Sequence, residues 1–268
     1  MSASISKFQI LALNDAETSE NRIHSDEIAK KHGFSSALVS GVNVFGYLSQ
    51  PLVRAYGEAW LTEGIMNVIF IKPAYQDSLL TIETENLGQE SSQRSHLSTA
   101  QDEQGTPLAR LETWLPNELP APQPLADMPS GKEITERPMI HWDAVQLQQP
   151  APYYDWLPTD ELNQEYVHSQ RDQSDVYSGS SAPIHPYLLL DAANKALMRL
   201  YFMPAWVHTG SNLVVRKCLR AGDAIQIRSM PIEKWERKGH QFVKLYVAMW
   251  VNGEVAVEIE HSAIFRLA

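Results

Sequence analysis

Proline is unevenly distributed along this chain of 268 residues, and its distribution constrains the fold more than any other feature. Nine of the sixteen prolines lie between Pro116 and Pro158, among Gln, Asp and Ser residues. Such a segment cannot sustain a helix or a central strand, because proline lacks the backbone N–H and fixes its own φ angle. We therefore predict an N-terminal module, residues 1–115, a Pro-rich linker, residues 116–152, and a C-terminal module, residues 153–268.

The two modules share one order of predicted elements. Apolar residues at helical spacing predict a helix over residues 42–56, kinked or interrupted at Pro51, and a second helix over residues 187–201. Four strands are predicted after each helix: residues 66–72, 79–85, 94–100 and 108–115 in the first module, and residues 212–218, 224–229, 241–251 and 255–265 in the second. The repeated order indicates an internal duplication.

The last two predicted strands give the clearest local signal. Apolar and more polar residues alternate from Val243 to Val251, Asn252-Gly253 favours a tight turn, and the alternation resumes at Val255. This pattern predicts an antiparallel hairpin with one apolar face. A long helix wrapped by an antiparallel β-sheet, present twice, buries both the helix stripe and the sheet face. The predicted fold class is therefore α+β, with two tandem modules of this kind.

A motif in the first module points to a family. Asn21-x-x-His24 is followed by a short helical stretch, by Gly33, and by Ser40-Gly41 at the start of the first long helix. This arrangement resembles the MaoC-like (R)-specific enoyl-CoA hydratases and dehydratases, in which Asn stands three residues before a catalytic His and a His-Gly or similar pair opens the long helix. The resemblance implies a tandem (double) hot-dog protein, with a pseudo-dimer inside one chain; a further homodimer remains an open alternative.

The motif departs from the family pattern at two positions. Ser19 stands where the active hydratases have Asp, so that Glu17 and Glu20 are the nearest carboxylates, and Arg22 replaces the Pro that follows the Asn. The catalytic dyad is thus incomplete by motif.

The resemblance implies reversible hydration of a 2-enoyl-CoA to a 3-hydroxyacyl-CoA, a hydro-lyase reaction. His24 would be the general base, since the usual imidazole pKa lies close to neutral pH. Glu20 is the candidate to replace the missing Asp, and Asn21 would hold the water or the loop. Free N–H groups at the start of the first long helix, around Ser40, Gly41 and Val42, would bind the thioester oxygen. Coenzyme A enters only as part of the substrate, and no metal site is predicted.

The second module lacks an Asn-x-x-His, so we predict that it is the structural half. Residues 182–187 correspond to residues 37–42 and place His185 at the position of the family's His-Gly pair, where it could shape a second pocket, although Pro186 removes the N–H that Gly41 supplies. Arg237 and Lys238 belong to a charged hairpin loop. Contact with the phosphates of coenzyme A is the alternative interpretation of these two residues.

Composition excludes several other classes. The net charge of −10 argues against attraction to nucleic acid or to anionic membranes, and the single Cys218 excludes an internal disulfide or a cysteine-based zinc site. Because the chain has no long apolar run, we expect neither secretion nor a membrane span, and a cytoplasmic location.

Two other functions remain open on the same fold. The first is an acyl-CoA thioesterase, with Asp191 on the second helix as the candidate carboxylate. The second is a non-catalytic acyl-binding or assembly subunit, which Ser19 favours because it breaks the dyad.

Overall fold

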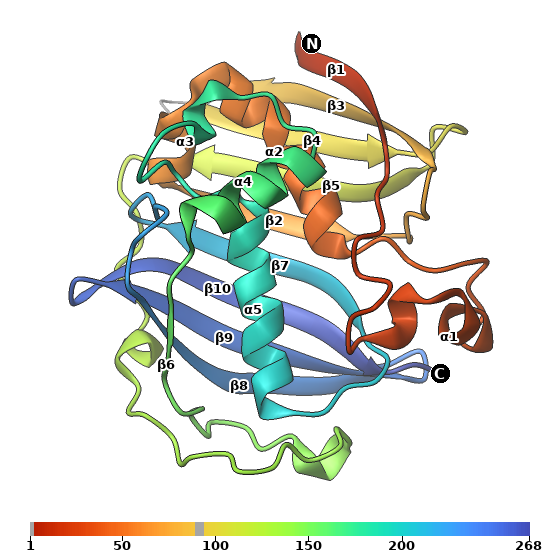
Figure 1. The fold of residues 1–268 in the computed structure, drawn as a ribbon, viewed down its shortest axis with the longest axis vertical. Coiled ribbons are helices and arrows are strands. Elements are labelled where there is room, and N and C mark those ends of the chain that lie inside the picture. Colours follow the sequence, from red (N-terminus) through yellow and green to blue (C-terminus); the bar gives the residue numbers. More distant parts are fainter. Residues whose placement is uncertain (1–2, 89–93) are drawn as a thin grey trace.

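In the computed structural model, which describes residues 3–88 and 94–268, strands from both halves of the chain form one continuous antiparallel sheet (Figure 1). The strand order is β1-β3-β4-β5-β2-β7-β10-β9-β8-β6. The strands are β1 Ala3–Leu11, β2 Gly64–Phe70, β3 Leu79–Gly88, β4 Arg94–Gln101, β5 Pro107–Leu115, β6 Tyr154–Trp156, β7 Val207–Val215, β8 Ile225–Arg237, β9 His240–Val251 and β10 Glu254–Arg266.

The two halves of the sheet meet at β2 and β7, which pair antiparallel. Asn67 lies opposite Asn212 at this junction. Asn67 and Asn212 are 145 positions apart in the sequence. The same offset relates an isolated bridge in each module: Leu38 pairs with Tyr75 in the first, and Pro183 pairs with Arg220 in the second. The modules are therefore related by a pseudo-two-fold axis through the β2–β7 pair, as in a dimer contained within one chain.

One long helix crosses each half of the sheet, and both helices lie on the same face (Figure 1). These are α2, Gly41–Tyr56, and α5, Tyr187–Leu200; both of the predicted long helices are thus present. Helix α2 continues through Pro51 without interruption. The shorter helices and turns are η1 Arg22–His24, α1 Asp26–Lys31, α3 Glu58–Thr62, η2 Pro124–Asp127, η3 Trp142–Ala144, α4 Asp160–Ser169 and η4 Asp175–Tyr177. None of the helices in the described part of the chain is long and apolar enough to cross a membrane.

A single apolar core lies between the helices and the sheet and joins both modules. In β9 the alternate residues Val243, Leu245 and Val247 face this core, as the sequence pattern predicts. Tyr246 and Ala248 face the other side of the sheet, and they are fully buried as well.

The Pro-rich segment covers this other side of the sheet. Ala126 and Met128 pack against Tyr246 and Ala248, and the backbone N–H of Gln123 donates to the buried carboxylate of Glu258 at 2.8 Å. Residues 116–152 thus carry no long helix or strand, as their prolines predict, but they belong to the body of the protein.

The predicted hairpin between the last two strands is confirmed. Val251 pairs with Glu254, and the turn residues Asn252 and Gly253 have φ angles of 53° and 82°. Strand β8 is longer than predicted, because it continues past Ser229 through a bulge beside Pro231. The predicted charged loop is consequently only the turn at Lys238-Gly239, and Arg237 is the last residue of the strand.

Candidate active site

The Asn-x-x-His motif forms a tight turn that docks on the second module. Asn21, only 4% exposed, precedes η1 and accepts a hydrogen bond from the backbone N–H of Ile23. Its side chain also pairs with the backbone of Trp206: Nδ2 donates to the carbonyl oxygen at 3.0 Å, and Oδ1 accepts from the N–H at 3.1 Å. Because a backbone N–H can only donate, this pairing fixes which way the Asn21 amide points.

His24 is held as a neutral base. Its Nδ1 lies 2.7 Å from the carbonyl oxygen of Leu38. A carbonyl only accepts, so Nδ1 carries the proton and Nε2 keeps its lone pair, 3.3 Å from the Nδ2 of Asn21. Burial lowers the pKa of His24, and the bond to Leu38 opposes that shift only in part. The imidazole is therefore neutral at neutral pH, with its one ring proton on Nδ1.

Two cavities meet at this imidazole. Both are lined by Asn21, His24, Ser40, Asn194 and Trp206. The first cavity has a volume of about 340 Å³ and mostly apolar walls, which include Phe34, Leu38, Val44, Phe70, Leu108 and Val207. The modules share its lining, since Asn194, Trp206 and Val207 come from the second module. This lining is typical of a small-molecule pocket, because such pockets are mostly apolar with a few placed polar groups.

The second cavity, of about 310 Å³, contains carboxyl groups. Asp15 lines it, and loss of hydration against the cavity wall raises the pKa of Asp15, opposed by a hydrogen bond with Asn43. Burial also raises the pKa of Asp191, which forms an ion pair with Lys195 at 2.7 Å. Asp15 was not predicted, and no motif distinguishes it in the sequence; only the fold brings it to the cavity that His24 lines.

Gly41 opens α2 where the helix meets the first cavity. The Ser40 side chain makes no capping hydrogen bond, so the first N–H groups of the helix, at Gly41 and Val42, have no partner within the helix. A Cβ at Gly41 would lie 3.2 Å from the Phe70 ring and 3.3 Å from Nδ1 of His208. A side chain at this position would therefore crowd both rings. Ser40 lines both cavities, and Val42 lines the second.

Glu20 lies in a different environment from the one proposed for it. Its carboxylate accepts two hydrogen bonds from the guanidinium of Arg137, at 2.9 and 2.8 Å, and it lines neither cavity. Ser19 does line the second cavity, and its hydroxyl donates to the backbone oxygen of Asn21 at 3.1 Å. The carboxyl groups in the cavity that His24 lines therefore include Asp15 and Asp191 but not Glu20.

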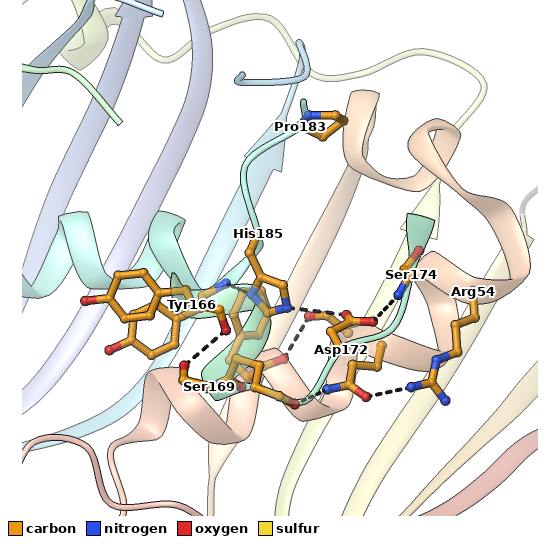
Figure 2. Close-up of polar contacts among 12 residues, drawn as sticks. Arg54, Tyr166, Ser169, Asp172, Ser174, Pro183 and His185 are labelled. Atoms are coloured by element: carbon orange, nitrogen blue, oxygen red, sulfur yellow. Dashed lines mark hydrogen bonds and ion pairs between the residues drawn. The ribbon is translucent and has the colours of Figure 1, made fainter. Parts of the chain in front are cut away.

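His185 lies in a packed polar cluster and lines neither cavity (Figure 2). Its Nε2 is 3.4 Å from Oδ2 of Asp172, and both side chains are fully buried. The backbone N–H of Tyr187 donates to its Nδ1 at 3.2 Å, so His185 caps the start of α5. The Gln170 side chain fills the space above Gly46, where a Cβ would collide with its Oε1. The position equivalent to the first site is thus occupied by the protein itself.

Arg237 and Lys238 are exposed at the tip of the β8–β9 hairpin and line neither cavity. His240 on the same hairpin lines the first cavity, together with Lys72 and His32. Basic side chains therefore border the apolar cavity, and one of them, His240, is close in sequence to the two predicted phosphate contacts. Among the described residues, no three His, Cys, Asp or Glu side chains gather to hold a metal ion.

Solved structures resemble this chain over nearly its full length. A MaoC domain dehydratase protein from Chloroflexus aurantiacus shares 10% identity with a TM-score of 0.71 over 100% of this chain and 95% of that one. A Mycobacterium tuberculosis protein described as a double hotdog fold shares 13% identity with a TM-score of 0.70 over 98% and 96%. An acyl-ACP thioesterase from Bacteroides thetaiotaomicron shares 14% identity with a TM-score of 0.51 over 97% of each chain.

These likenesses establish the fold. The predicted α+β architecture of two tandem hot-dog modules is confirmed, and so is the resemblance to MaoC-like dehydratases at the level of structure. No protein-family model matches the sequence, and no curated protein is similar to it in sequence. The fold serves dehydratases and thioesterases alike, so the reaction must be inferred from the side chains in the site.

Proposed function

We propose that this double hot-dog protein is a hydro-lyase that catalyses the reversible hydration of a 2-enoyl thioester, with His24 as the general base. The observation that carries the proposal is the unprotonated Nε2 of His24, fixed by Leu38 and Asn21 at the junction of two cavities. A neutral base beside an apolar cavity and a free helix N-terminus is what the addition of water to an enoyl thioester requires.

The steps follow from this placement. Nε2 of His24 removes a proton from a water molecule as the water oxygen bonds to C3 of the substrate. The C2–C3 π electrons move toward the thioester oxygen, which the N–H groups at Gly41 and Val42 stabilise. Asp15, whose pKa is raised, then delivers a proton to C2. The same groups act in reverse order for dehydration.

The substrate carrier is coenzyme A or a carrier protein, and we infer no other cofactor. Arg237 and Lys238, together with His240 and Lys72 at the first cavity, are the proposed contacts for its phosphates. One chain supplies every proposed catalytic group, so the pseudo-dimer suffices without a second copy. We propose that the activity is cytoplasmic, because a chain with a single cysteine fits a reducing compartment.

The decisive experiment follows crotonyl-CoA and longer enoyl-CoA analogues by the absorbance of the conjugated enoyl band and, in parallel, by free thiol. Hydration removes the band without releasing thiol. His24→Ala should lower turnover by at least about 10²-fold, the low end for a general base. The matched control is His168→Ala, since His168 is exposed on α4 and lines neither cavity. Equal turnover in the two variants would exclude His24 as the base.

Thioester hydrolysis is the second candidate, and the position of Asp191 favours it. This carboxylate lies on α5 and lines the same cavity as His24. Hydrolysis would release thiol from saturated and unsaturated substrates alike, and Asp191→Asn would abolish it. A protein that binds these thioesters and changes neither signal would instead be the non-catalytic subunit.

A further inference from the structure

A second histidine faces the first cavity from the other module. His208 lies on β7, is only 7% exposed, and lines the cavity. Its Nδ1 has no hydrogen-bond partner among the described residues. That atom lies 3.3 Å from where a Cβ of Gly41 would be, so it points at the start of α2. A buried polar atom without a partner beside a ligand cavity indicates a group that the ligand satisfies.

We propose that Nδ1 of His208 donates a hydrogen bond to the thioester oxygen of the substrate, opposite the N–H groups of Gly41 and Val42. This inference rests on the proposed function and assigns a catalytic role to the second module, which the sequence predicts to be only structural. The oxygen would lie between donors of both modules, so that each half contributes to stabilising the negative charge that develops on it.

The surroundings of His208 hold its ring in place. Nε2 lies 2.9 Å from the hydroxyl of Ser211, which lies 3.1 Å from Nδ1 of His261. The Phe70 ring packs at 4.7 Å and the His261 ring at 4.1 Å, both measured between ring centroids. A preorganised donor of this kind needs no reorganisation when charge develops during the reaction.

The position of the proton follows from the same contacts. Burial and the neighbouring His261 hold the pKa of His208 well below its usual value, against the opposing effect of a backbone hydrogen bond with Gly210, so the ring is neutral and carries one proton. Ser211 has one hydroxyl proton to give to one of the two imidazoles. If His208 receives it, Nδ1 of His208 carries the ring proton and faces the cavity. In the opposite arrangement His261, fully buried, would have an unpaired N–H at Nε2. In the free protein either arrangement leaves one buried ring N–H without a partner, at Nδ1 of His208 or at Nε2 of His261. Of these two histidines only His208 lines the first cavity, so a bound thioester oxygen would pair the N–H of the first arrangement and thereby favour it.

Two substitutions of His208 separate the proposed role from a merely structural one. In His208→Asn the amide nitrogen takes the position of Nδ1, whereas in His208→Gln it takes the position of Nε2 and can still reach Ser211. Donation to substrate therefore predicts that the Asn variant stays closer to wild type in kcat, and that the Gln variant loses about 10²–10³-fold, as when an oxyanion donor is removed. A role limited to the contact with Ser211 predicts the opposite ranking.

A spectroscopic measurement tests the inference without turnover. The probe is a ketone analogue of butyryl-CoA, ¹³C-labelled at its carbonyl, in which a methylene group between carbonyl and sulfur prevents hydrolysis. We expect infrared difference spectra to show a lower carbonyl frequency when it is bound to wild type or His208→Asn than to His208→Gln. Binding with the same frequency in wild type and His208→Gln would overturn the inference alone. Failure of the analogue to bind wild type would overturn the proposed function and the inference with it.

Discussion

The link between Asn21 and Trp206 provides the most direct test of how the site is built. Asn21 joins the turn that carries His24 in the first module to the backbone of the second through two hydrogen bonds, at 3.0 and 3.1 Å. Asn21→Ala removes both. The N–H and the carbonyl of Trp206 then lose their partner in a region where Trp206 itself is only 2% exposed.

The expected magnitude follows from these two groups. A buried polar group left unsatisfied costs about 1–3 kcal/mol, so the two together could cost about 2–6 kcal/mol. Both cavities border Trp206, and water entering from them can satisfy part of this demand. We therefore expect a loss of about 2–3 kcal/mol in the free energy of unfolding, close to one fully unsatisfied group. For a chain of this size that corresponds to a fall in Tm of about 5–10 °C.

Urea and thermal unfolding would measure the loss, with Asn14→Ala as the matched control. The Asn14 side chain donates to the backbone oxygen of His24 at 2.9 Å and accepts a longer bond from the N–H of Ala16 at 3.3 Å, in a less buried position where water can replace both. Its removal should cost about 1 kcal/mol or less. The reasoning would be refuted if the two variants unfolded at the same urea concentration, because Asn21 would then add nothing by bridging the modules.

Three further predictions concern the carbonyl site, the base and the Pro-rich segment. Gly41→Ala places a methyl group 3.2 Å from the Phe70 ring, so kcat/KM should fall at least about 10-fold, beyond any change in Tm, in paired kinetic and melting assays. Because burial lowers the pKa of His24 from 6.5, kcat/KM should rise with pH below that value as His24 loses its proton, and should stop rising by neutral pH, where loss of the proton from Asp15 lowers it; a rise that continues above pH 7 would contradict the assignment. Glu258→Ala leaves its partner Arg216 unpaired and should cost about 3–5 kcal/mol. Amide hydrogen exchange near Gln123 should also become faster, because the Gln123 backbone N–H donates a hydrogen bond to the Glu258 carboxylate.

Local sequence patterns predict the scaffold well, because periodicity and turn chemistry act over a few residues. Both long helices and the hairpin at Asn252-Gly253 follow from such patterns. The edge strand β1 was not predicted, since its serines and its Lys7 obscure the alternation around Phe8 and Ile10. The packing of residues 116–152 on the sheet was also missed. Tyr246 and Ala248, on the supposedly outer face of β9, were the signal that something covers that face.

The site is less predictable, because its walls come from distant parts of the chain. The motif brings Asn21 and His24 together within four residues, but Trp206 lies 185 positions from Asn21. Nothing in the sequence around His208 indicates that it faces the start of the first module's helix. Glu20 was a reasonable candidate from spacing alone. The structure pairs it with Arg137, and no sequence pattern could have indicated that ion pair, whose members lie 117 positions apart.

The pseudo-symmetry also explains why, among the described residues, the position in the second module that is equivalent to the first site is closed. Ser40-Gly41 and His185-Pro186 occupy equivalent positions, 145 residues apart, yet small residues leave a cavity in the first module and large ones fill it in the second. Asp191 on α5 is likewise the equivalent of Gly46 on α2. Asp191 places a carboxylate at the cavity of the first site. Gly46 has no side chain, and the Gln170 side chain fills the space at the equivalent position of the second. Under the proposed function the two modules have therefore specialised: the first supplies His24 and the helix N-terminus, and the second supplies Trp206, Asn194 and His208 to the same cavity, so neither hot-dog module alone would form the site.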